Sequence, residues 1–70
     1  MDRMINVQMA IMSHLSDSQY LMRSLQVEKA ERHVDFAKLL MMEYSGNLNV
    51  YVSRDTLDEL WMSLDHTDEK

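Results

Sequence analysis

The side chains in this sequence that could take part in chemistry are three histidines, several serines and a number of carboxylates. His14, His33 and His66 lie far apart along the chain. No two of them have the spacing of three or four residues that puts two ligands on one helical face. No motif sets a serine or another nucleophile against a base. We therefore predict no catalytic residues and no enzymatic activity.

Metal and cofactor sites are also not expected from the local patterns. The chain has no cysteine, which excludes disulfides and thiolate metal sites. Glu28, Glu31 and Asp35 fall on one face of a predicted helix, but carboxylate metal sites in bundles also use Glu-x-x-His pairs, and the sequence has none. The single glycine, Gly46, does not make a glycine-rich phosphate loop. The prediction is no metal and no cofactor.

Residues 52–57, Val-Ser-Arg-Asp-Thr-Leu, are similar to the start of the recognition helix in many helix-turn-helix DNA-binding proteins. Three features of the context argue against that function. Tyr51 stands where the tight turn usually needs a glycine, and the residues before the motif look extended. The helix itself carries Asp55, Asp58 and Glu59, whose charges would repel DNA. Direct binding of nucleic acid is therefore not expected, although a dimeric DNA-binding transcriptional regulator remains an alternative.

Composition sets the size and class of the protein. The chain has 70 residues, of which 46% are hydrophobic, so it forms one small domain and is not disordered. We assign residues 1–64 to that domain and 65–70 to a polar tail. No export signal is visible, and the longest uncharged stretch, 4–16, is too short to span a bilayer. A cytoplasmic protein with no membrane contact is the expectation.

The absence of proline and the single glycine favour long helices, because both residues interrupt them. Ser16 and Gln19 fit a capping box, in which each side chain satisfies a free backbone N–H of the other, so a break is predicted just before them. One continuous helix up to Tyr44 is the alternative. Ser45-Gly46-Asn47 should end the second helix, because glycine readily adopts the left-handed conformation after a helix. The predicted helices are about 3–14, 17–44 and 54–64.

Residues 48–52 alternate apolar and polar side chains, which indicates a short strand or an extended connector. No partner strand is expected within the chain. Ser53 or Asp55 should cap the last helix. The apolar face of that helix is formed by Leu57, Leu60, Trp61 and Leu64.

The second predicted helix has two apolar stripes on nearly opposite sides, whereas a surface helix needs only one. A chain of this size is marginally stable alone and, without disulfides or a metal, can gain from a second subunit. We therefore predict an all-α helical bundle formed by a homodimer. One stripe consists of Leu21, Leu25, Phe36 and Leu39. The other, Val27, Ala30, Val34, Ala37 and Met41, is the predicted dimer interface, together with part of the first helix.

Charge and composition favour a function in binding. Twelve acidic and seven basic residues give a net charge of −5, which suits solubility or a partner with a basic surface. Eight methionines provide adaptable apolar surface. We expect a small regulator or inhibitor that binds a protein stoichiometrically, with a nucleic-acid-handling protein as a plausible target. Anti-CRISPR proteins and antitoxins, often carried by mobile elements, resemble it in size and charge alone. A structural assembly subunit is a further alternative. The predicted contacts with the partner are Asp55, Asp58, Glu59 and Trp61.

Overall fold

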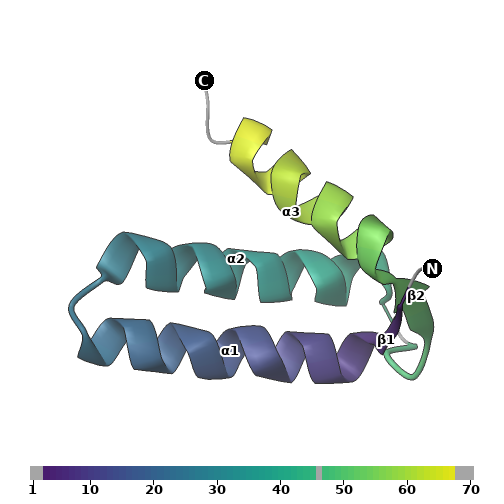
Figure 1. The fold of residues 1–70 in the computed structure, drawn as a ribbon, viewed down its shortest axis with the longest axis horizontal. Helices are drawn as coiled ribbons and strands as arrows, with labels where there is room; N and C mark the ends of the chain where they lie inside the picture. Colours follow the sequence, from purple (N-terminus) through teal and green to yellow (C-terminus); the bar gives the residue numbers. More distant parts are fainter. Residues whose placement is uncertain (1–2, 46, 68–70) are drawn as a thin grey trace.

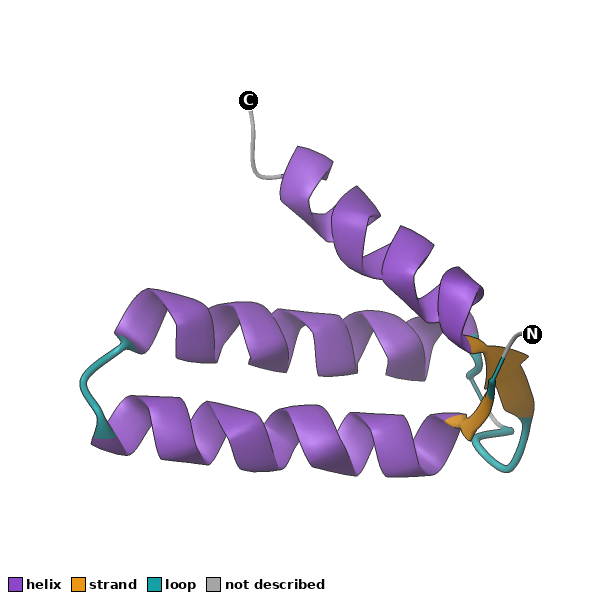
Figure 2. Ribbon diagram, in the orientation of Figure 1, coloured by secondary structure: helices purple, strands orange, loops and turns teal. Residues whose placement is uncertain are grey.

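The structure, a computed structural model, describes residues 3–45 and 47–67. Two long helices form an antiparallel hairpin, a small two-stranded sheet lies at the end of the hairpin near the N-terminus, and the third helix diverges from the hairpin (Figure 1). Figure 2 shows that helices make up most of the chain, as the sequence predicts. The elements in order are β1 (Met4–Asn6), α1 (Val7–Arg23), α2 (Val27–Glu43), β2 (Tyr51–Ser53) and α3 (Arg54–Thr67).

The two strands pair with each other, so the expectation that the extended segment has no partner within the chain is wrong. Met4 lies opposite Ser53 and Asn6 opposite Tyr51 in an antiparallel register. The backbone N–H of Arg54 extends the pairing by donating to the carbonyl of Arg3 at 2.8 Å. Residues 4–6 were predicted to be helical because they continue an apolar pattern, and a strand of three residues is too short to show a period of its own.

This strand pair also positions the start of α1, where the first N–H groups of a helix have no partner within it. The N–H of Val7 donates to the carbonyl of Val50 at 2.9 Å, and that of Gln8 to Leu48 at 3.2 Å. The side chain of Asn6 accepts from the N–H of Met9 at 3.1 Å. The connection between α2 and β2 therefore caps α1 and holds the end of the hairpin together.

The predicted break before Ser16 is wrong, because α1 continues through it to Arg23. Ser16 and Gln19 are exposed residues in the middle of the helix. Ser18 is buried, and its hydroxyl donates to the carbonyl of Ala30 in α2 at 2.9 Å. This contact requires residue 18 to lie inside α1, so packing between the two helices overrides the local preference for a cap.

The real break lies at residues 24–26, so the alternative of one continuous helix is wrong as well. The N–H of Gln26 donates to Leu21 and that of Leu25 to Met22, which is the hydrogen-bond pattern of a Schellman motif. Leu25 adopts a left-handed conformation with φ of 61°. Glycine usually occupies this position. Because this chain has leucine there, the sequence gives no indication that a turn lies at these residues.

The other boundaries lie close to the predictions. α2 ends at Glu43, and Gly46, the residue predicted to end it, lies outside the described residues. Ser53 caps α3, because its hydroxyl oxygen accepts from the N–H of Thr56 at 3.1 Å. α3 extends to Thr67, so residues 65–67 of the predicted polar tail belong to the helix, and 68–70 are not described.

The core lies where α1, α2 and the start of α3 meet. Ala10 on α1 and Ala30 and Ala37 on α2 are buried, and these small side chains allow the two helices to approach closely. None of the helices in the described part of the chain has the length and apolar character needed to cross a membrane. The buried hydrophobic cluster consists of Val7, Ala10, Ile11, Phe36, Ala37, Leu40 and Leu57.

Candidate functional site

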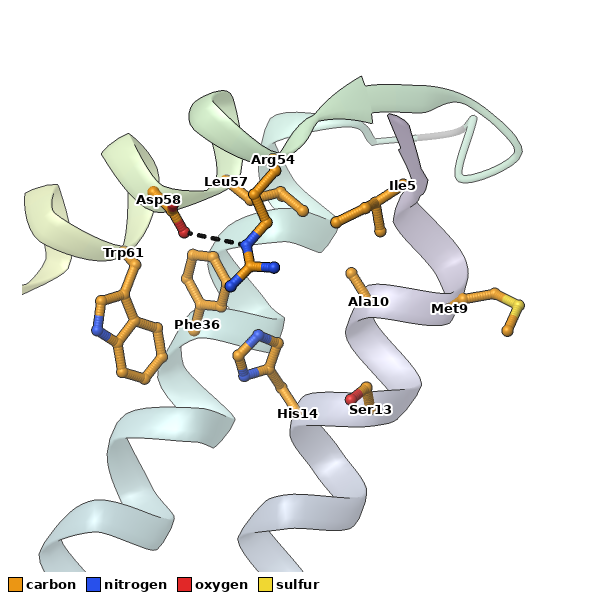
Figure 3. A pocket seen from close by; sticks show the side chains of 10 residues that line it. All are labelled: Ile5, Met9, Ala10, Ser13, His14, Phe36, Arg54, Leu57, Asp58 and Trp61. Carbon is orange, nitrogen blue, oxygen red and sulfur yellow. Dashed lines mark ion pairs between the residues drawn. The ribbon is translucent and has the colours of Figure 1, made fainter. Parts of the chain in front are cut away.

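A pocket opens between α1 and α3, with α2 behind it (Figure 3). It forms because Leu57, in the first turn of α3, is anchored in the core, whereas the rest of the helix diverges from the hairpin (Figure 1). Its volume is about 480 Å³, within the range of pockets that bind small molecules. The lining residues are mostly apolar: Ile5, Met9, Ala10, Ser13, His14, Phe36, Arg54, Leu57, Asp58 and Trp61.

Charged groups are found on the α3 side of the pocket. Figure 3 shows the side chain of Arg54 extending from the start of α3 into the space between the helices. Its Nε lies 3.6 Å from a carboxylate oxygen of Asp58, one helical turn later. Both side chains are about 60% exposed, so the ion pair adds little stability. Both charges therefore remain accessible to a bound partner.

Aromatic rings and two histidines form a cluster at the other end of the pocket. The ring of Trp61 packs edge-to-face on Phe36, with centroids 5.0 Å apart, and stacks on His14 at 5.5 Å. His33, from α2, lies 5.1 Å from the Trp61 ring. The guanidinium carbon of Arg32 lies 5.0 Å from the centroid of the same ring, a cation–π contact. The structure places His33 half-buried.

The two histidines meet directly across the hairpin. Their Nδ1 atoms lie 2.8 Å apart, so one nitrogen donates a proton and the other accepts it. Burial lowers the pKa of His14 below its ordinary value of 6.5, the nearby His33 lowers it further, and Asp17 acts in the opposite direction. Two imidazolium ions at this distance would repel each other, which disfavours protonation of both rings at once.

Asp17 completes a group of potential metal ligands. It follows His14 by three residues on α1, so the two side chains share a face of the helix. One ligand atom from each of His14, Asp17 and His33 can be chosen so that all three lie within 4.8 Å of one another. The His-x-x-Asp spacing was visible in the sequence, but the third member joins only because the hairpin places residues 14 and 33 opposite each other.

The residues predicted to bind a partner are only partly brought together. Asp58 and Trp61 both line the pocket. Asp55 and Glu59 are exposed on the same helix but do not line it. The pocket therefore contains one predicted carboxylate and the predicted aromatic anchor. Sequence reasoning missed its α1 side, because α1 is distant from α3 in the sequence and only the packing of the helices brings the two together.

The residues predicted to form a dimer interface divide into two groups. Ala30 and Ala37 are fully buried within the chain, so they are not accessible to a second copy. Val27 and Met41 are more than 40% exposed, and Val34 is half-buried. Successive residues of an α-helix are rotated by about 100°, so these three side chains lie on the flank of α2 opposite Phe36. Phe36 itself contacts Trp61 of α3.

Apolar side chains on α1 continue this flank. Leu15 and Met22 are seven residues apart and lie on the side of α1 away from the pocket residue Ser13, and Met12, three residues before Leu15, lies next to them on the outer side of the helix. All three are exposed to between 38% and 61%. We call the combined surface the back face of the hairpin; it consists of Met12, Leu15, Met22, Val27, Val34 and Met41.

Comparison with protein-family models, curated proteins and solved structures finds no significant match to this chain. Its function is therefore inferred from its own residues.

Proposed function

We propose that this protein is a small, non-enzymatic regulator or inhibitor that binds a protein partner stoichiometrically through the pocket between α1 and α3. The observation that carries the proposal is an open, mostly apolar pocket of about 480 Å³ with the indole of Trp61 in its wall. Tryptophan is enriched among the residues that dominate binding energy, and such residues lie in or beside pockets. The occupant we propose is an apolar side chain of the partner.

The charges around the pocket favour a partner segment that is basic next to this apolar side chain. Asp58 lies at the pocket, and Glu59 and Asp55 are exposed on the same helix. The whole chain carries a net charge of −5, which attracts a basic surface over a distance of several ångströms. A basic groove of a nucleic-acid-handling protein has this chemistry.

We further propose that the protein acts as a homodimer that buries the back face. α3 lies against the opposite side of the hairpin, so nothing in the described chain covers the exposed methionines of the back face. Met41 and Val27, which the sequence placed in a dimer interface, are part of it. A second copy would add an apolar contact to a chain whose own core is small.

The partner-binding proposal can be tested with a photo-crosslinking amino acid at Ser13, which lines the pocket, and the same probe at Glu43, at the end of α2, as a control. A protein crosslinked from position 13 and not from position 43 is then purified, and its association rate is measured. The double charge reversal Asp58→Lys and Glu59→Lys should slow association at low salt, because long-range attraction sets the rate.

The matched control for that experiment is the double reversal Glu28→Lys and Glu31→Lys. It makes the same change in net charge at exposed positions on α2. Equal slowing by both pairs would mean that only the net charge matters. An unchanged rate in Asp58→Lys and Glu59→Lys would refute an electrostatic role for α3.

Sedimentation equilibrium tests the dimer. Met41→Glu should shift the mass toward that of a monomer, because it places a charge in a desolvated contact. Met62→Glu changes a similarly exposed methionine on α3 and should leave the mass unchanged. A monomer mass for the unmodified protein would refute the dimer, and a mass larger than a dimer would favour an assembly subunit.

The alternative of a DNA-binding regulator is tested by a mobility-shift assay. In the structure, residues 44–53 separate α2 from α3, and β2 directly precedes α3. A helix-turn-helix motif instead places two helices around a short turn. A shift that survives competitor DNA would favour the DNA-binding alternative over the protein-binding proposal.

A further inference from the structure

We propose that His14, Asp17 and His33 form a binding site for a divalent transition-metal ion, with Zn²⁺ as the best-suited candidate. The site joins the middle of α1 to the middle of α2. It adjoins the proposed partner contact on α3, because His14 lines the same pocket and its ring stacks on Trp61.

The chemistry of the three side chains suits such an ion. Neutral imidazole nitrogen and carboxylate oxygen are both zinc ligands, and three protein ligands leave a position for water. Asp17 is exposed and the two histidines are half-buried, so an ion has a route from solvent. The residues come from two helices that are already packed together, so little chain entropy is lost when the ion binds.

The distances require only a small adjustment. Two nitrogen ligands of a tetrahedral zinc ion lie about 3.3 Å apart when each is about 2.0–2.1 Å from the metal. The Nδ1 atoms of His14 and His33 are 2.8 Å apart. Ring rotations that separate them by about 0.5 Å would admit the ion. The proton shared between the two Nδ1 atoms would move through solvent to an Nε2, which leaves both rings neutral and both Nδ1 lone pairs directed at the metal.

The nearby charges have opposite effects. The carboxylate of Asp17 is part of the site and attracts a cation. The guanidinium of Arg32 lies over Trp61, whose ring stacks on His14, and its charge disfavours a cation. Arg54 and Asp58, which line the same pocket, form an ion pair whose opposite charges largely cancel in their effect on a cation. Coordination by two nitrogens therefore has to supply most of the binding energy.

Trp61 supplies a direct readout, because it is the only tryptophan in the chain and contacts both histidine rings. Untagged protein is titrated with Zn²⁺ and, separately, with Co²⁺. The expected result is saturable binding of one ion per chain, with a change in Trp61 fluorescence for Zn²⁺ and a visible d–d absorption band for Co²⁺. At a free zinc concentration tenfold above Kd, the melting temperature should rise by about 6–11 °C.

Three variants separate this site from others. His33→Gln should abolish the response. Asp17→Asn should weaken zinc affinity on the order of tenfold or more. Because residue 17 is exposed, this substitution should have little effect on folding. His66→Gln removes the one remaining histidine and should bind as the unmodified protein does. Absence of saturable binding in the unmodified protein, or binding by His33→Gln that equals that of the unmodified protein, would overturn the proposal.

Discussion

Leu25 is in a conformation that suits glycine, and replacing it with glycine should stabilise the protein. The residue has φ of 61° in the turn between α1 and α2. For a residue with a Cβ atom, the left-handed region costs roughly 1–2 kcal/mol. The side chain is 84% exposed, so removing it sacrifices little burial. The hydrogen bonds of the turn come from the backbone and remain available to glycine.

The magnitude follows from two opposing effects. Relief of the left-handed strain contributes about 1–2 kcal/mol, whereas the greater freedom of glycine in the unfolded chain costs about 0.5–1 kcal/mol. From the middle of each range, the net increase in the free energy of unfolding is about 0.75 kcal/mol, which corresponds to a rise in melting temperature of roughly 3–6 °C.

Urea unfolding followed by circular dichroism measures this change for Leu25→Gly. The control is Leu25→Ala, which also removes the exposed side chain but keeps the Cβ atom and the strain. Leu25→Gly should be clearly more stable than Leu25→Ala. If the two variants are equally stable, residue 25 is not held in the left-handed conformation, and our account of the turn is wrong.

Two further predictions concern the cap of α3 and the histidine pair. Ser53→Ala should lower the free energy of unfolding by about 1 kcal/mol, because the N–H of Thr56 loses its acceptor. Urea unfolding measures this change, and an unchanged midpoint would contradict the cap. With a chelator present, the free energy of unfolding should fall as pH drops below 6.5. Burial and then His33 lower the pKa of His14 in the folded protein, and Asp17 opposes them. The unfolded chain therefore binds more protons than the folded chain at this residue below pH 6.5. His14→Gln should lose part of that slope, and identical pH profiles would show that His14 does not contribute.

The sequence by itself determined the helical class and several element boundaries. The absence of proline and the single glycine allowed long helices, and the hydroxyl of Ser53 marked the start of α3. The apolar spacing on α3 also identified a face that packs inward, since Leu57 is buried and Trp61 packs on Phe36. These features depend on neighbouring residues and on helical periodicity, which a sequence displays directly.

Only the tertiary structure decided where the hairpin turns and what it brings together. The capping sequence at Ser16 does not end α1, because Ser18 forms a hydrogen bond to Ala30 from inside the helix. The turn lies at Leu25, which adopts a strained left-handed conformation. Because the turn lies at residues 24–26 and not at the predicted break, His14 faces His33 across the hairpin. No local pattern in the sequence could indicate this pairing. Such pairings depend on which helices pack and in what register, and that is set by close contact between small side chains distant in sequence.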